Sequence, residues 1–285
     1  MESINGTDSR QIALDLLLPV GVAVGLVFIH LLVPLRMRSS LAFTPNWFTF
    51  HSLITAPYVH ADAVHLVENT ALFLVTASLV YALTLFVRLR KWFHVTAPAL
   101  LLGLPIVHNL LVYLIAQAFG IEDLAAQFGF SSIGAGFAAF LLVATVVYIF
   151  DGYGRKGVAA FVSLLAVIVA AVMVLSFVSD ISTVLIGAGV ISPLLAMGWY
   201  RCRQTKTLRR PARIESPIPT DATVLTLAML VLVLEISSLF QVGMDPVSVG
   251  LSHAIPFGLG LIISVLAYWF VGLSMTQNNG QTRRD

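Results

Sequence analysis

The sequence predicts an all-α fold, a polytopic bundle of about eight transmembrane helices. Hydrophobic residues make up 58% of the 285 residues, charged residues only 11%, and the mean hydropathy is +0.93. Ordinary soluble domains carry about 25% charged residues, so this composition excludes that class. The apolar residues also gather in runs of about 20, the length of helix that crosses a hydrocarbon layer about 30 Å thick.

Eight such runs follow one another, and no remaining stretch is long enough to form a separate soluble domain. The first run is too long, and its flank too polar, for a cleaved signal peptide, so we expect it to be a retained span. Residues 1–285 are therefore expected to form a single membrane domain. The predicted spans are Ile12–Leu35, Val64–Val87, Thr96–Phe119, Phe130–Phe150, Val158–Val178, Ile181–Tyr200, Ala222–Val242 and Val249–Leu273.

Basic residues predict the orientation of these spans. They follow the even-numbered spans or, in the case of Arg10, precede the first, and only Arg36 and Arg38 fall on the other side. Because cytoplasmic loops carry the excess of Lys and Arg, both termini are expected in the cytoplasm, which also supports an even number of spans. The residues on the expected inner side are Arg10, Arg88, Arg90, Lys91, Arg155, Lys156, the six basic residues between Arg201 and Arg213, and Arg283 with Arg284.

Three polar residues, His60, His65 and Asn69, stand at the start of the second span. Imidazole and amide groups are costly in hydrocarbon and usually serve a site or face a wet cavity. His65 and Asn69 are four residues apart, so they project from one helix face about one turn apart. His60 lies in the approach to the helix and can line the same cavity. A lone histidine is more often structural, and we interpret four others in that way: His30, His51, His94 and His108.

A serine begins the fourth span and a histidine begins the eighth, Ser131 and His253. In the expected orientation the second, fourth and eighth spans all run from outside to inside. His65, Asn69, Ser131 and His253 are therefore expected at a similar depth near the outer face. A shared depth is what a single site requires, so the combination predicts a site although each member alone does not.

The segment before Ser131 indicates how its hydroxyl can act. At a helix N-terminus the unpaired N–H groups and the helix dipole favour negative charge. Serine is also a common N-cap, so this position alone fits a structural role equally well. Close packing of the fourth and eighth spans would bring Ser131 within reach of His253, as an activated Ser–His pair requires. Small residues permit such packing, and the two spans offer Gly134 and Gly136, and Gly258 and Gly260.

Taken together, these motifs resemble those of the rhomboid intramembrane serine proteases. The family's second core helix carries His, four residues, His, three residues, Asn, which this chain matches without a gap. Its nucleophile motif is Gly-x-Ser-Gly with a small residue five positions after the serine, and its last core helix carries a histidine with small residues three and seven positions on. The resemblance covers the core spans and the loop from Trp47 to Tyr58. The residues at these motif positions are His60, His65, Asn69, Gly129, Ser131, Ser132, Gly136, His253, Pro256 and Gly260.

The resemblance implies a rhomboid-like core and a protease that uses a Ser–His dyad without an orienting carboxylate, cofactor or metal. Ser131 would attack the scissile carbonyl, with His253 as base and then acid. The oxyanion would be held by the Ser131 N–H with the side chains of His65 and Asn69, and His60 would line the cavity that admits water. The implied substrates are single-pass transmembrane proteins, cut near the outer membrane face. By analogy with the family, the membrane is a prokaryotic plasma membrane; the oligomeric state stays open.

Four features depart from the family's pattern. Ser132 stands in place of glycine, Ala135 in place of an aromatic residue, and Pro256 in place of a small residue. The family has one span between the nucleophile and base helices, whereas three are predicted here. We expect an extra pair within about 158–242, which preserves the direction of the base helix and leaves open which span is the family's fifth.

Other functions stay open on the residues alone. One is a catalytically inactive rhomboid-like protein that binds or escorts membrane clients. Another is a transporter, because an intramembrane acid such as Glu235 often marks an ion path. His108 and Asn109 form a second polar pair, but no internal repeat is visible.

A metal at His60 and His65 would lack a third ligand. No nucleic-acid-binding patch is present, and we interpret Cys202 as a surface thiol.

Overall fold

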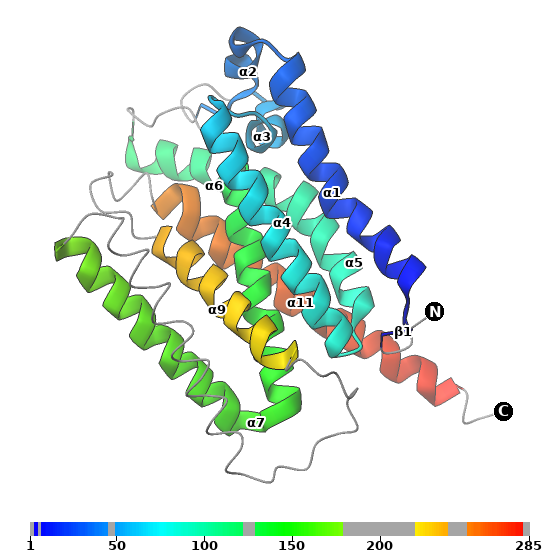
Figure 1. Cartoon of the computed structure of the whole chain (residues 1–285). Helices are drawn as coiled ribbons and strands as arrows, with labels where there is room; N and C mark the ends of the chain where they lie inside the picture. Colours follow the sequence, from blue (N-terminus) through cyan, green and yellow to red (C-terminus); the bar gives the residue numbers. More distant parts are fainter. Residues whose placement is uncertain are drawn as a thin grey trace.

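The computed structural model describes residues 3–4, 7–44, 49–121, 129–178, 220–238 and 250–281. Apart from a short hairpin of β1 (Ser3–Ile4) and β2 (Thr7–Asp8), these residues form helices and their connections (Figure 1). The predicted all-α class is therefore confirmed at this level. The helices in chain order are α1 (Ser9–Leu32), α2 (Leu35–Leu41), α3 (Ser52–Thr55), η1 (Ala56–Tyr58), α4 (Ala63–Phe86), α5 (Arg90–Pro98), η2 (Ala99–Gly103), α6 (Leu104–Phe119), α7 (Ser131–Val178), α9 (Thr220–Ser238), η3 (Gly250–Ala254) and α11 (Ile255–Gln281).

Within the described residues, five helical stretches are long and apolar enough to cross a membrane, as expected of an integral membrane protein. A shorter apolar stretch, Thr223–Glu235, lies in α9. The predicted span Ile181–Tyr200 and the basic loop with Cys202 lie outside the described residues, as do Trp47 and Phe48 at the start of the loop that ends at Tyr58. The total of eight spans therefore stays a prediction. The five stretches are Ser9–Leu32, Ala63–Phe86, Arg90–Phe119, Ser131–Ala166 and Ser252–Leu273.

The predicted fourth and fifth spans are the two arms of α7. The helix bends at Gly154, whose backbone has φ 64° and ψ −164°, and the second arm turns back in the opposite direction, with α9 between the two arms in this view (Figure 1). Only glycine adopts this conformation without strain from a side chain. The expected break between the two spans is therefore a kink at Gly154, where the backbone leaves helical angles.

The third span begins at Arg90, six residues earlier than the sequence predicts. Its first turn looks polar, yet the Trp92 side chain is fully buried and its Nε1 donates a hydrogen bond to the Ser264 carbonyl of α11 at 2.9 Å. Phe93 is buried as well. The span starts early because tertiary packing uses these two aromatic side chains, which hydropathy alone does not reveal.

The first arm of α7 lies at the centre of the bundle, in contact with α4, α9 and α11 (Figure 1). Edge-to-face aromatic contacts hold its start to α4: the Phe73 ring lies 4.9 Å from that of Phe130 and 5.1 Å from that of Phe137. Such pairs add to the stabilisation from burial alone. The start of α7 is thus fixed against α4, on which the predicted site depends.

The helices α7 and α11 come close together at Gly136 and Gly260. A Cβ atom on Gly260 would come within 2.7 Å of both the Cα and the carbonyl oxygen of Gly136. Backbones can meet this closely only where both residues are small. Of the two glycines predicted on each span, these two make the crossing, whereas a Cβ on Gly258 would meet nothing within 4 Å.

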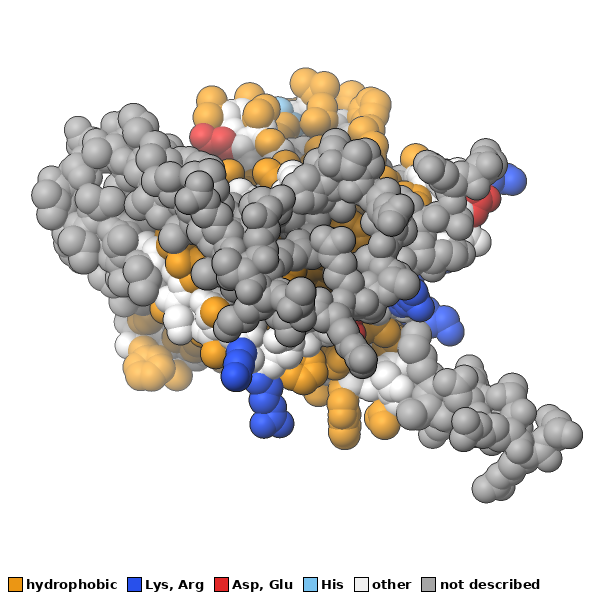
Figure 2. All heavy atoms as spheres, turned by 60° about the horizontal axis from the view of Figure 1, so that its bottom comes forward, with side chains coloured by type: hydrophobic (Ala, Val, Ile, Leu, Met, Phe, Trp, Pro, Cys, Tyr) orange, Lys and Arg blue, Asp and Glu red, His pale blue; other side chains and the backbone are white. Residues whose placement is uncertain are grey.

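Figure 1 shows the relative direction of the helices. The starts of α4, α7 and α11 lie at the end of the bundle that carries α2 and α3, and both chain termini lie towards the opposite end. Lysine and arginine side chains project from that opposite end among hydrophobic ones (Figure 2). The first residues of α4, α7 and α11 therefore lie at a similar level along the bundle.

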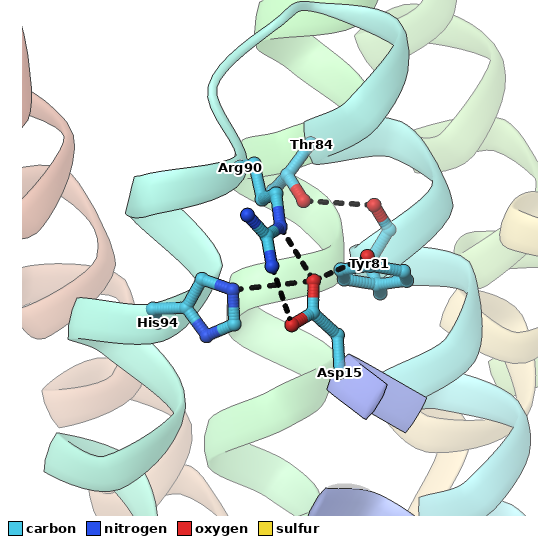
Figure 3. Close-up of polar contacts among 5 residues, drawn as sticks. All are labelled: Asp15, Tyr81, Thr84, Arg90 and His94. Atoms are coloured by element: carbon cyan, nitrogen blue, oxygen red, sulfur yellow. Dashed lines mark hydrogen bonds and ion pairs between the residues drawn. The ribbon is translucent and has the colours of Figure 1, made fainter. Parts of the chain in front are cut away.

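A buried carboxylate fastens α1 to α4 and α5 near the opposite end. Asp15 receives hydrogen bonds from Arg90 at 2.6 and 2.8 Å and from the Tyr81 hydroxyl at 2.5 Å, with His94 at 3.3 Å (Figure 3). Four side chains of α1 are buried, and Asp15 is one of them. Leu26 of α1 also belongs to the apolar core, and Ile12, Leu16 and Val22 pack against it, so the polar cluster adds to an apolar attachment of this helix.

Candidate functional site

An aspartate before α4 sets the position of the two polar residues in its first turns. The Asp62 carboxylate accepts a hydrogen bond from the His65 backbone N–H at 2.8 Å and so caps the helix. Capping satisfies an N–H that the first turn leaves without an intrahelical partner. The helix therefore begins at Ala63, and His65 and Asn69 stand about one turn apart on it.

His60 is completely buried and contacts the segment before Ser131. Its Nε2 accepts a hydrogen bond from the Phe130 backbone N–H at 3.3 Å, and its ring centre lies 5.4 Å from that of His65. Burial, with a smaller contribution from the nearby His65, lowers the pKa of His60 to about 4. The imidazole is therefore neutral at neutral pH, as an acceptor at Nε2 requires.

Gly129 brings the start of α7 against α4. Its φ of +97° lies in the left-handed region, and a Cβ there would come within 2.6 Å of the His65 Cε1 and 3.3 Å of the Asn69 Nδ2. Both the backbone angle and the lack of space require glycine. The residue two positions before Ser131 is thus in direct contact with the two polar side chains of α4.

Ser131 is the first residue of α7, and hydrogen-bond donors surround this helix start. The first intrahelical bond runs from the Gly134 N–H to the Phe130 carbonyl at 2.8 Å, so the preceding N–H groups of the first turn have no intrahelical partner. The Asn69 Nδ2 is buried and has no hydrogen-bond partner among the described residues. Such donors, together with the helix dipole, stabilise negative charge.

His253 lies in η3, the turn directly before α11, and is partly buried. Its imidazole is close enough to His65 for an electrostatic interaction. Ser131 lies five residues before Gly136 on α7, and His253 lies seven residues before Gly260. At 1.5 Å per residue these separations are about 8 and 10 Å along the two helices. The two side chains do not hydrogen-bond to each other, so the Ser–His contact stays a prediction.

The three residues that depart from the family's pattern are all buried. Ser132 and Ala135 are 7% and 2% exposed and face the interior of the bundle. Pro256 is the second residue of α11 and follows the π-helical turn η3 (Gly250–Ala254) without a break.

Several contacts around the site involve residues that motif spacing does not single out. The Gly129 N–H donates to the Ala56 carbonyl at 3.3 Å, the Tyr58 hydroxyl donates to the Leu101 carbonyl, and the Asn109 Nδ2 donates to the Leu53 carbonyl at 2.9 Å. These bonds tie α3 and η1 to α6, η2 and the start of α7. The sequence gives only a weak signal for these contacts: Asn109 is a polar residue inside a predicted span, whereas the other partners have no distinctive pattern.

Glu235 also lies closer to the site than the sequence indicates. Its Oε1 is 3.9 Å from the position that a Cβ would take on Gly134, one turn after Ser131. The side chain is 7% exposed. Glu235, which the sequence alone suggests as a possible part of an ion path, therefore lies next to α7, the helix that carries the candidate nucleophile.

Among the described residues, no group of three or more His, Cys, Asp or Glu side chains is arranged to hold a metal ion. The polar side chains that meet at the starts of α4 and α7 are suited to hydrogen bonding and proton transfer. Comparison of the chain with protein-family models, with curated proteins and with solved structures finds no match in any of the three.

Proposed function

We propose that this chain is an intramembrane serine endopeptidase of the rhomboid type, with Ser131 as nucleophile and His253 as general base. The observation that carries the proposal is the contact of Gly129 with His65 and Asn69. It joins the nucleophile motif of one helix to the oxyanion motif of another, although 60 or more residues separate them in the sequence. A structural serine at a helix start has no need of such neighbours.

The proposed reaction needs only groups of this chain and one water. Ser131 Oγ attacks the substrate carbonyl carbon while its proton passes to the His253 imidazole. The carbonyl oxygen becomes an oxyanion held by the Ser131 N–H, Asn69 and His65. His253 returns the proton to the leaving nitrogen as the C–N bond breaks. Water then attacks the acyl ester with His253 again as base, and the proton returns to Ser131 Oγ as the ester bond breaks.

Ser131 and His253 must come together for this reaction. Catalytic hydrogen bonds are often long in unliganded enzymes and shorten when substrate binds. The Gly136–Gly260 crossing supports this step because it fixes the two helices a short distance below both residues. Each oxyanion donor contributes about 2.7–4 kcal/mol in enzymes of known mechanism.

The proposed substrates are single-pass membrane proteins that enter from the bilayer and unwind at the cleavage site, because a helical peptide bond is engaged in its own hydrogen bonds. Residues with low helix propensity, such as Gly or Pro, lower the cost of unwinding. In the family's order one span directly precedes the base helix. We assign α9 to that position since it packs against both α4 and α7, and we assign the extra pair to the second arm of α7 and Ile181–Tyr200.

We further propose a prokaryotic plasma membrane with both termini in the cytoplasm. The support is the distribution of Lys and Arg over the loops and the placement of both termini towards one end of the bundle (Figure 1). This orientation puts Ser131 near the outer face. Labelling of single cysteines introduced near Ser3 and near Ser40 with an impermeant reagent tests it, after Cys202 is replaced by serine.

Activity-based labelling tests the proposed nucleophile. Membranes containing the wild-type chain are treated with a fluorophosphonate, which reacts with activated serines. We expect labelling of the wild type, none of Ser131→Ala, and at least a 100-fold slower reaction of His253→Ala, since the base activates the hydroxyl. Ser132→Ala is the matched control and should label normally. Loss of labelling in Ser132→Ala with retention in Ser131→Ala would reassign the nucleophile.

A catalytically inactive, client-binding role is the second candidate. It is favoured by the missing hydrogen bond between Ser131 and His253 and by Ala135 in place of an aromatic residue. Incubation of purified wild type and Ser131→Ala with a model single-pass substrate separates the two functions. Cleavage by the wild type alone supports the protease, whereas co-purification of the uncut substrate with both proteins, and no cleavage by either, supports the binding role.

A further inference from the structure

Arg38 is one of the two basic residues that the charge distribution leaves on the outer side, and its side chain reaches from α2 to the site. One of its amino groups, Nη1, donates a hydrogen bond to the His60 carbonyl oxygen and lies 2.7 Å from the His30 Nδ1 of α1. The guanidinium thus links three segments: α1, α2 and the approach to α4. Its neighbour Arg36, on the same short helix, is exposed.

The same His60 that accepts from Arg38 also holds the start of α7. Its ring Nε2 accepts the Phe130 N–H at 3.3 Å, and Phe130 directly precedes Ser131. A continuous series of hydrogen bonds therefore runs from Arg38 through the backbone and ring of His60 to the residue before the proposed nucleophile. Both groups of His60 are buried, so loss of one bond is not simply replaced by water.

The partners of Arg38 indicate what it does there. Salt bridges within the described residues involve Asp15 and not Arg38, and the acceptors of Arg38 are a carbonyl and an imidazole. The planar guanidinium holds such acceptors in a fixed geometry, which a flexible lysine does less well. The positive charge of Arg38 also contributes to the low pKa of His60, after burial and the nearby histidines, and so keeps the ring in the form that accepts from Phe130.

We propose that Arg38 is a positioning residue that, through His60, fixes the Phe130–Ser131 backbone against His65 and Asn69. This inference rests on the proposed function for its catalytic consequence, and on the hydrogen bonds alone for its structural part. Removal of the guanidinium releases the His60 carbonyl, the ring then shifts, and the Phe130 N–H loses its acceptor. Displacement of a reacting group by about 1 Å can lower a rate by about 100-fold.

Cleavage kinetics test the catalytic consequence. We expect Arg38→Ala to lower kcat for a model single-pass substrate by about 10- to 100-fold with KM within about twofold, because geometry and not substrate affinity is lost. Arg38→Lys, which retains a donor, should recover part of the rate. Arg36→Ala removes the same charge two residues earlier on the same helix and should match the wild type. Full kcat in Arg38→Ala overturns the catalytic consequence, as does an equal loss in Arg36→Ala.

A second readout does not depend on activity. The Phe130 amide signal is followed by NMR in detergent with ¹⁵N-phenylalanine and assigned from Phe130→Leu. Arg38→Ala should move this signal and Arg36→Ala should not; an unmoved signal in Arg38→Ala overturns the positioning role. If Arg38→Ala does not fold, Arg38→Met retains the apolar stem and removes the donors. A wild type without cleavage activity refutes the proposed function, and the amide signal then decides the positioning role by itself.

Discussion

Gly129 lies directly against His65, so closely that a Cβ atom on the glycine would be 2.6 Å from the imidazole Cε1. The contact fixes the start of α7 to the face of α4 that carries the polar residues. It depends on two properties of glycine, a φ of +97° and the absence of a side chain. Position 129 is therefore a sensitive point for both folding and the proposed activity.

Gly129→Ala should abolish the labelling of Ser131 and lower the thermal stability. The left-handed backbone costs a residue with a Cβ about 1–2 kcal/mol, and the contact with His65 adds displacement of that ring. Gly120→Ala is the matched control, since Gly120 also has a positive φ of +63° but open space around its Cβ position. It should lose a similar amount from the backbone and retain labelling. Equal labelling by both variants would contradict the geometry at Gly129.

Gly260→Ala should separate α7 from α11. The new methyl group would lie 2.7 Å from backbone atoms of Gly136, which cannot move without shifting the helix. Overpacking of this kind typically costs about 1–3 kcal/mol, and the shift would also move His253 away from Ser131. Gly258→Ala, two residues earlier on the same helix, meets nothing within 4 Å and should be neutral. Thermal unfolding in detergent and fluorophosphonate labelling of the two variants measure both effects.

Much of the fold could be predicted because its signals are local. A run of about 20 apolar residues specifies a span whatever it packs against, and the spans through α1, α4, α6 and α11 follow from composition alone. The spacing of His65 and Asn69 on one helix face is also local. The approach of Gly136 to Gly260 can also be predicted, because two small residues on each span favour close packing of the two helices.

The remainder depends on contacts between distant residues. The early start of the third span rests on Trp92, which donates to a carbonyl 172 positions later in the chain. The link from Arg38 to His60 and the place of Glu235 beside Gly134 have no local pattern either. Each depends on which helices are neighbours, and the spacing of residues within one helix does not give that information.

Stability should fall in acid because His60 is buried as a neutral imidazole. Its pKa is about 4 in the folded chain and about 6.5 when unfolded, so between these values the unfolded state binds more protons. Stability is then complete above about pH 6.5 and declines as the pH falls to 4, by about 3 kcal/mol at one pKa unit per 1.36 kcal/mol. His60→Asn should flatten this dependence between pH 7.5 and 4.5, whereas the same change at exposed His51 should leave it intact. An unchanged slope in His60→Asn would refute the assignment.

Asp15→Asn should loosen α1 from the bundle. The carboxylate holds Arg90 through two hydrogen bonds of 2.6 and 2.8 Å and accepts a third from Tyr81 (Figure 3). The side chain of Asp15 is buried but that of Arg90 is 35% exposed, so the cost should lie between those of exposed and buried pairs, about 2 kcal/mol.

A double-mutant cycle separates this ion pair from its surroundings. Arg90→Gln alone leaves a buried carboxylate without its cation and should be at least as destabilising as Asp15→Asn. The double variant should then lose less than the sum of the two, with a coupling of about 1 kcal/mol or more measured by thermal unfolding. Simple additivity would mean that the apolar side chains of α1, and not the ion pair, hold this helix against α4 and α5.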